Sequence, residues 1–192
     1  YLLGGGFDVS WVPTYNYGKV NLFKDNEWID LVKDIPELKD ILDITDIAVD
    51  PRDENHIYIA SYGFGLLEIK DNKIINIFNG TNSPLTPPPS LSLEQVRIGG
   101  LAYDKDNNLW ITNSLGERIL HVILANGNWG EVNIPSNLSN KEVSEITIDT
   151  YGQKWLKARE SGTIYVINDN GTPEYGGDDR ANALNYAPGN GN

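Results

Sequence analysis

A block of residues returns three times along this chain. In each copy, apolar residues alternating with small or polar ones precede an aspartate, a polar turn follows, and the next strand-like segment carries an aromatic residue. The aspartates are Asp50, Asp104 and Asp149, so the spacings are 104 − 50 = 54 and 149 − 104 = 45 residues. Short strands that recur every 40 to 50 residues, roughly, are typical of β-propellers, in which four-stranded blades stack around an axis. The copies are residues 47–50 leading to 57–59, 101–104 leading to 109–111, and 146–149 leading to 154–156.

A partial fourth copy precedes these three. Residues 22–29 match residues 68–75 at a fixed offset of 68 − 22 = 46. The sequence therefore predicts an all-β fold with about three and a half four-stranded blades, whereas propellers close with about four to eight. We expect a β-propeller fragment, in which all 192 residues are part of one propeller domain. The expected units are a blade part at 1–34 and blades at 44–79, 97–134 and 145–185.

Individual strands follow from alternation and turn signals within each copy. Tyr58, Trp110 and Trp155 begin the second strands, where a large flat ring can fill the gap between neighbouring blades. Asn-Gly or Asp-Asn pairs after the third strands predict tight hairpins. Fourth strands are expected at 74–78 and 129–134, with 28–32 in the leading part, and a turn or two of helix at 35–41.

Composition excludes several classes of function. Fifteen basic and 27 acidic residues give a net charge of −12, which argues against a nucleic-acid partner because phosphate binding needs a clustered positive field. The absence of cysteine excludes disulfides and thiolate chemistry. No run approaches the roughly 18 to 20 apolar residues that span a bilayer, so an export signal or anchor is expected outside this sequence. The two histidines, His56 and His121, lie far apart in the sequence.

The turn that joins the aspartate to the aromatic residue resembles the repeat of two-component-regulator propellers. Residues 104–110 and 149–155 carry this string. Further segments narrow the resemblance to the PorZ-type propellers of the type IX secretion system, over roughly residues 45 to 185. These segments are 60–66, 79–85, 152–155, 168–172 and 178–179.

The resemblance implies a bacterial, Bacteroidota-type cell-envelope protein that is exported to the periplasm or the outer-membrane surface. Members of the PorZ-type family act in the complex that attaches secreted cargo to anionic lipopolysaccharide, so protein partners are implied, with glycan or lipopolysaccharide as a further ligand class. The alternative is the periplasmic ligand-sensing propeller of a hybrid histidine kinase. These readings differ in the rest of the protein: a C-terminal sorting β-sandwich in the first, a membrane helix and kinase in the second.

The chain departs from the usual repeat where the second strands end. Residues 112–117 and 157–162 replace the common glycine-rich turn. No family ligand residue falls on a matching position, so none is carried over. No pair of carboxylates stands out as a catalytic pair, since separation in space decides such mechanisms. We therefore expect a binding protein rather than an enzyme.

Aromatic residues near turns are the candidate ligand-binding residues. We expect Tyr62, Phe64 and Tyr151 to be exposed and to stack on a sugar or hold a partner loop, because loops on a rigid scaffold carry binding sites. The alternative is that they are ordinary surface aromatics, which are common.

The acidic segment near the C-terminal end is the candidate metal site. Its oxygen donors are of the hard, flexible kind that calcium accepts, but their order is not that of an EF-hand loop. An ordinary acidic hairpin loop without a metal is the alternative, and no other cofactor is expected. The candidate ligands are Asn168, Asn170, Asp178 and Asp179.

Overall fold

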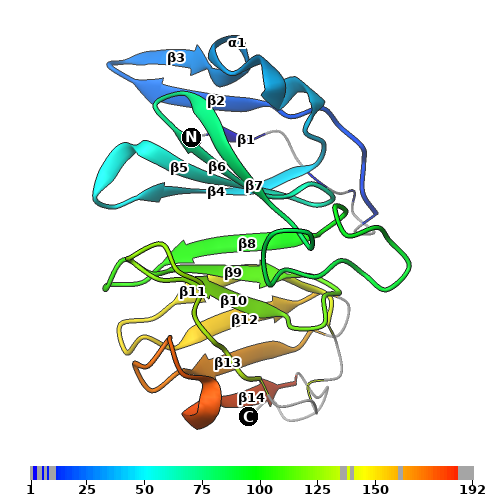
Figure 1. Ribbon diagram of the computed structural model, residues 1–192, viewed down its shortest axis with the longest axis vertical. Helices are drawn as coiled ribbons and strands as arrows, with labels where there is room; N and C mark the ends of the chain where they lie inside the picture. The colour runs from blue at the N-terminus through cyan, green and yellow to red at the C-terminus, as the bar shows by residue number, and fades with distance from the viewer. Residues whose placement is uncertain are drawn as a thin grey trace, which may run out of the picture.

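The computed structural model describes residues 2–3, 6, 8, 12–134, 138, 141–159 and 162–185. Within these residues the strands form four antiparallel sheets that follow one another from the first at the top of Figure 1 to the fourth at the bottom. The all-β fold is therefore confirmed, and the sheets form an incomplete β-propeller. No helix in the described part is long and apolar enough to span a membrane.

The first sheet contains β1 (Leu2–Leu3), β2 (Val20–Lys24) and β3 (Glu27–Asp30). Its hairpin turn uses Asp25 and Asn26, which both have positive φ angles of 52° and 64°, as type I′ turns require. The strand predicted at 28–32 ends earlier than expected, at Asp30. The Asp30 side chain accepts a hydrogen bond of 3.1 Å from the Val32 amide and caps helix α1 (Leu31–Asp34), which stops the strand. The predicted helical turn follows as η1 (Pro36–Asp40).

The second sheet has four strands in the order β4-β5-β6-β7. The last of them confirms the fourth strand expected at 74–78. Asp71 and Asn72 form its final hairpin turn with φ angles of 50° and 58°. The strands are β4 (Ile44–Asp50), β5 (Asp53–Ser61), β6 (Gly65–Lys70) and β7 (Lys73–Phe78).

The third sheet has three strands, β8 (Ile98–Tyr103), β9 (Leu109–Asn113) and β10 (Leu120–Ile123). The fourth strand predicted at 129–134 is wrong. Within the described residues that follow β10, the chain returns beside this strand at an isolated bridge between Ile123 and Trp129. The Glu131 amide then donates to the carbonyl of Pro173, at 3.1 Å, so the backbone leaves β10 and binds a loop of the fourth sheet.

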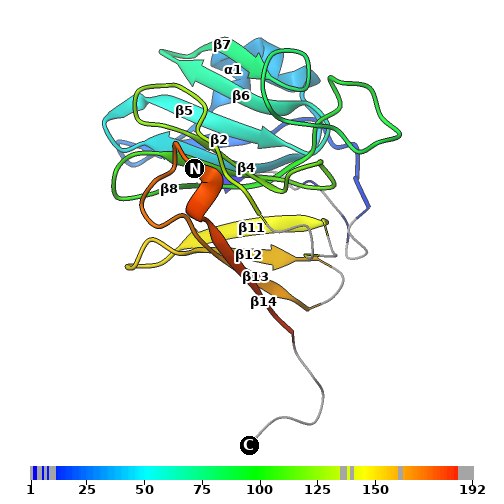
Figure 2. The same cartoon turned by 60° about the horizontal axis from the view of Figure 1, so that its bottom comes forward.

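The fourth sheet again has four strands, in the order β11-β12-β13-β14. The short helix η2 (Gly176–Asp178) precedes its last strand (Figure 2). The pairing register between β11 and β12 shifts at a bulge between Val143 and Ile146. The strands are β11 (Val143–Ile148), β12 (Lys154–Ala158), β13 (Ile164–Asn168) and β14 (Arg180–Leu184).

The first strands of neighbouring sheets lie against one another, since β8 contacts both β4 and β11. Glycine at position 99 permits this approach, because a Cβ atom there would lie 2.6 Å from the Val143 carbonyl oxygen. Hydrogen bonds cross between the sheets. The Leu101 amide donates to the Asp46 carboxylate at 2.8 Å, and the Thr112 hydroxyl donates to the Ser144 carbonyl at 2.6 Å. Burial raises the pKa of Asp46, and the Leu101 amide opposes that rise.

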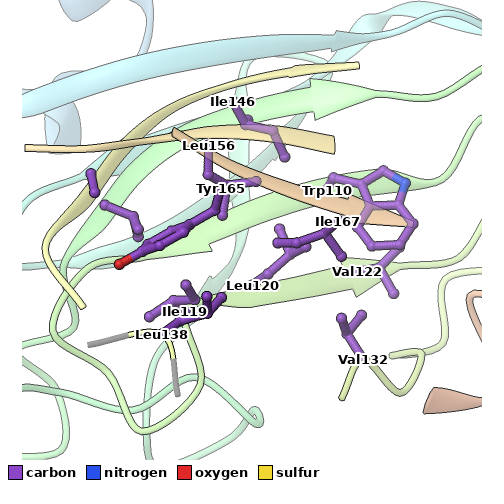
Figure 3. Packing of buried hydrophobic residues seen from close by; sticks show 12 residues of the cluster. Trp110, Ile119, Leu120, Val122, Val132, Leu138, Ile146, Leu156, Tyr165 and Ile167 are labelled. Carbon is purple, nitrogen blue, oxygen red and sulfur yellow. The ribbon is translucent and has the colours of Figure 1, made fainter. Parts of the chain in front are cut away.

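Three apolar cores fill the spaces between successive sheets. Tyr58 lies in the core between the second and third sheets, and Trp110 lies in the core between the third and fourth sheets (Figure 3). The predicted placement between blades is therefore confirmed for Tyr58 and Trp110, whereas Trp155 is only partly buried and belongs to none of these cores. Burial of large rings is a major source of stability in such a fold.

Candidate functional site

Three equivalent positions of the repeat meet at one end of the stacked sheets. They lie four residues after the aromatic of each second strand: 62 − 58, 114 − 110 and 159 − 155 all equal 4. Each backbone amide makes the same bond to the segment that precedes its inner strand: Tyr62 to Asp43 at 2.9 Å, Ser114 to Arg97 at 2.8 Å and Arg159 to Glu142 at 2.8 Å. We call this end the loop end, and the opposite end, with the aspartate turns, the turn end.

Side chains from three sheets form a cluster at the loop end, which we call the Tyr62 cluster: Tyr62, Arg97, Ser114 and Arg159. The guanidinium carbons of Arg97 and Arg159 each lie 4.9 Å from the centroid of the Tyr62 ring. Arg159 also donates to the Tyr62 hydroxyl, which lies 3.4 Å from the Ser114 hydroxyl. Cations over an aromatic face are attracted by its quadrupole. The cluster therefore packs two guanidinium groups against one buried ring, in a chain whose net charge is −12.

The predicted ligand-binding aromatics do not form one site. Tyr62 is buried, with 4% of its surface exposed, so the expectation that it is exposed is wrong. Its burial follows from the packing of the two arginines against its ring. Phe64 lies at the same end and is 36% exposed, whereas Tyr151 lies at the turn end and is 88% exposed. Ligand binding by these three residues stays a prediction.

The predicted calcium ligands all lie at the turn end of the fourth sheet. The structure brings Asn170 and Asp178 together at 3.4 Å, while Asp179 accepts a hydrogen bond of 2.6 Å from the Asn133 amide. The Asn168 side chain accepts from the Asn170 amide at 2.9 Å. Burial raises the pKa of Asp179, and nearby carboxylates raise it further. Among the described residues no three His, Asp or Glu side chains form a metal-binding group, and calcium here stays a prediction.

The repeated aspartate organises the turn end. In the third sheet, Asp104 accepts from the Trp110 indole at 2.8 Å and from the Asn108 backbone amide at 2.9 Å. In the fourth sheet, Asp149 accepts from the Trp155 indole at 3.0 Å and from two turn amides at 2.9 Å. Burial opposes ionisation of Asp149, but the hydrogen bonds from the indole and the turn amides outweigh it and lower its pKa.

The second sheet builds the same turn from charged groups. Asp50 accepts two side-chain bonds from Arg52, both of 2.9 Å, and lies 3.0 Å from Nδ1 of His56. The other ring nitrogen of His56 lies 2.9 Å from Glu68, which also accepts from the Tyr58 hydroxyl at 2.9 Å. The Arg52 hydrogen bond is the main reason that the pKa of Asp50 lies well below its ordinary value. Burial, and then the charge of Glu68, raises the pKa of Tyr58.

Among the clefts that the described residues form at the turn end, two have a volume of about 460 Å³ each, within the usual range for small-ligand sites of about 300 to 1,000 Å³. The first lies between the second and third sheets and contains the charged network of His56. The second lies between the third and fourth sheets and is lined by Tyr151, Asn168 and Asn170. One aromatic and two amide residues predicted from the sequence therefore share a cleft.

Arg97, Ser114 and Arg159 were not predicted as site residues. A signal was present, because Tyr62, Ser114 and Arg159 share one repeat position and Arg97 lies seven residues before its aspartate, as Asp43 does (104 − 97 = 50 − 43 = 7). Equivalent positions of a propeller point to the same end of its axis. Their residue types differ between copies, so similarity between the copies alone hides them.

Comparison with solved structures supports the fold. The chain matches PorZ of Porphyromonas gingivalis, described as an essential bacterial surface component of the type-IX secretion system, with 25% identity and a TM-score of 0.66. The structural similarity to PorZ confirms the resemblance. The match covers 94% of this chain and 24% of PorZ, so the chain spans about a quarter of that protein.

A second match shows the fold alone. The extracellular domain of a hybrid two-component system from B. thetaiotaomicron aligns with 12% identity and a TM-score of 0.52, covering 75% of this chain and 18% of that one. No family model and no curated protein sequence matches this chain.

Proposed function

We propose that this chain is part of a non-enzymatic binding scaffold in a bacterial cell envelope, similar to the PorZ component of the type IX secretion system. The observation that carries the proposal is the match to PorZ across 94% of the chain. PorZ belongs to a secretion system, so protein partners follow by analogy, and an exported location follows in the same way. A fold hosts many functions, which makes the experiment below necessary.

The contacts of the ionisable groups support binding rather than catalysis. In the first cleft, Asp50 is held by Arg52 and His56, and Glu68 is held by His56 and Tyr58. A catalytic acid or base must instead present its proton or lone pair to a substrate. These groups hold the second sheet together and link it to the third, since Arg52 also donates to the Ala125 carbonyl at 2.7 Å.

A glycan is the second ligand class that we propose, at the cleft between the third and fourth sheets. The support is the exposed ring of Tyr151 beside amide side chains, a combination that suits a sugar. Titration of the chain with oligosaccharides should change its intrinsic fluorescence in a saturable way. The Tyr151→Ala variant should not show this change. Unchanged binding in Tyr151→Ala would remove this cleft from the proposal.

Deletion of the gene in its native host tests the scaffold function. We expect secreted cargo to be lost from the cell surface and to appear in the medium, while transcription of ligand-responsive operons is unchanged. The alternative is a sensor domain of a hybrid histidine kinase. The second structural match shows that such a domain has a similar fold and supports no more than that. Altered transcription with normal cargo attachment would support the sensor and contradict the scaffold.

A further inference from the structure

We propose that the Tyr62 cluster binds a carboxylate of an acidic segment in a protein partner, with Arg97 as the main contact. The inference rests on the proposed scaffold function and names the chemistry of its partner. It begins from the convergence of three sheets on one point. Tyr62 follows β5, Arg97 precedes β8, and Arg159 follows β12.

The charge of Arg97 distinguishes it from other cations of the chain. Most lysines and arginines that have described partners are paired with carboxylates, as Arg52 is with Asp50 and Lys154 is with Asp169. Within the described residues Arg97 has no ion pair, and its guanidinium lies against the Tyr62 ring. Its side chain is only partly buried. A partly exposed cation without a carboxylate is available to an anion from outside.

The Tyr62 ring beneath the Arg97 guanidinium favours binding of a carboxylate at the edge of that guanidinium. A guanidinium that stacks on an aromatic face keeps the N–H groups at its edge free to donate in the plane. Two parallel N–H groups match the two oxygens of a carboxylate, which gives a strong and directional contact.

The surroundings leave room for a peptide. A Cβ atom built on Gly63 would meet no atom within 4 Å, so the turn beside Tyr62 is open to solvent. Phe64 stands next to it and presents an apolar surface, with 36% exposed. The Leu115 amide, next to Ser114, donates to the Lys141 carbonyl at 2.8 Å, while the Lys141 ammonium group donates to the Glu117 carbonyl at 2.9 Å. An acidic segment with an apolar residue fits this surface.

The charge distribution favours docking at this end over the other. At the turn end the repeat aspartates Asp50, Asp104 and Asp149 are joined by Asp169, Asp178 and Asp179. An acidic partner that approaches the turn end meets these carboxylates, whereas Arg97 at the loop end offers it a partly exposed cation, which favours that orientation. The same field should make association weaken as salt increases.

Calorimetric titration of the 192-residue chain with hexaglutamate tests the proposal. We expect saturable binding that weakens at least tenfold in Arg97→Gln and that weakens less in Arg97→Lys, which keeps the charge but loses the fork. Arg180→Gln, an exposed arginine at the turn end, is the matched control and should bind like the parent chain. Thermal unfolding of each variant shows whether it folds, and Arg97→Lys supplies the readout if Arg97→Gln does not.

Three results would overturn the proposal. They are the absence of saturable hexaglutamate binding, equal losses in Arg97→Gln and Arg180→Gln, and binding of inorganic phosphate without binding of hexaglutamate. The gene-deletion experiment is independent of this titration. Loss of cargo attachment combined with no hexaglutamate binding would retain the scaffold function and remove only the carboxylate site.

Discussion

The second sheet and the two sheets after it solve the same structural problem with different chemistry. In the third and fourth sheets the repeat aspartate accepts from a tryptophan six residues later. In the second sheet the equivalent aromatic, Tyr58, comes eight residues after Asp50. It pairs with Ala48 just as Trp110 pairs with Ala102, so the ladder position is the same although the turn is longer.

The longer turn explains the change of partner. Two extra residues place Arg52 and His56 against the carboxylate, and the Tyr58 hydroxyl donates to Glu68 instead. An aspartate bound by indole and backbone groups has neutral partners, whereas Asp50 is part of an ionic network. In all three sheets the turn therefore keeps an aspartate carboxylate as hydrogen-bond acceptor. The donors differ: a tryptophan indole in the third and fourth sheets, and Arg52 and His56 in the second.

Trp110→Ala should have the largest effect on this comparison. The ring is fully buried between two sheets, and its removal leaves a cavity and takes one of the hydrogen bonds from Asp104, so we expect a loss of about 3 to 5 kcal/mol in unfolding free energy. Trp155→Ala is the matched variant on a partly exposed face and should cost less than half as much. Urea denaturation measures both, and equal losses would refute the packing difference between the third and fourth sheets.

Asp50→Asn should have the next largest effect. Because the side chain of Arg52 is nearly half exposed, solvent screens its pairing with Asp50, and we expect a loss of about 2 kcal/mol at pH 7. The lowered pKa means that this stabilisation is present above the unfolded value of 3.8 and is lost as pH falls through the folded value. The difference between the variant and the parent should therefore vanish in strong acid. Asp104→Asn, whose carboxylate has neutral partners, should cost less at pH 7.

His121→Phe tests a second source of acid sensitivity, which is independent of the Asp50 network. Burial lowers the pKa of His121 to about 4 from 6.5, so the neutral ring favours the folded state and stability falls as pH drops from 6.5 towards 4. Between pH 7 and pH 5 the parent chain should lose about 2 kcal/mol from this residue. Denaturation curves at both pH values should show a smaller loss in His121→Phe. An unchanged loss would place the acid sensitivity elsewhere.

Trp155→Phe should have the smallest effect. The variant keeps most of the ring and removes only the indole donor to Asp149, at a turn that retains two amide donors. Because solvent reaches this exposed turn and competes for the hydrogen bond, we expect a loss of unfolding free energy smaller than that of Asp50→Asn. A loss above that of Asp50→Asn would reverse the order proposed for the neutral and ionic turns.

The fold was largely predictable because its information is local and repeated. The aspartate turns and the Asp-Asn hairpins follow from side chains that bond to nearby backbone or adopt positive φ angles. The missing strand at 129–134 was not predictable, because the Glu131 amide is taken by Pro173, more than forty residues along the chain (173 − 131 = 42). Long-range competition of this kind leaves no local pattern.

The candidate site was less predictable than the fold. Exposed positions were inferred from turn composition, which identified Tyr151 and failed for Tyr62, since Arg97 and Arg159 from two other sheets cover its ring. Those arginines are separated by 62 residues (159 − 97 = 62) and meet only in the assembled stack. Comparing repeat positions, rather than motifs, is the route by which sequence could have revealed them.

The mass and sequence of the full gene product from its native envelope test the central claim most directly. The scaffold account predicts a second propeller and a C-terminal β-sandwich sorting domain in the same polypeptide as these 192 residues. A membrane-spanning helix followed by a histidine kinase domain would contradict it and assign this propeller to a sensor.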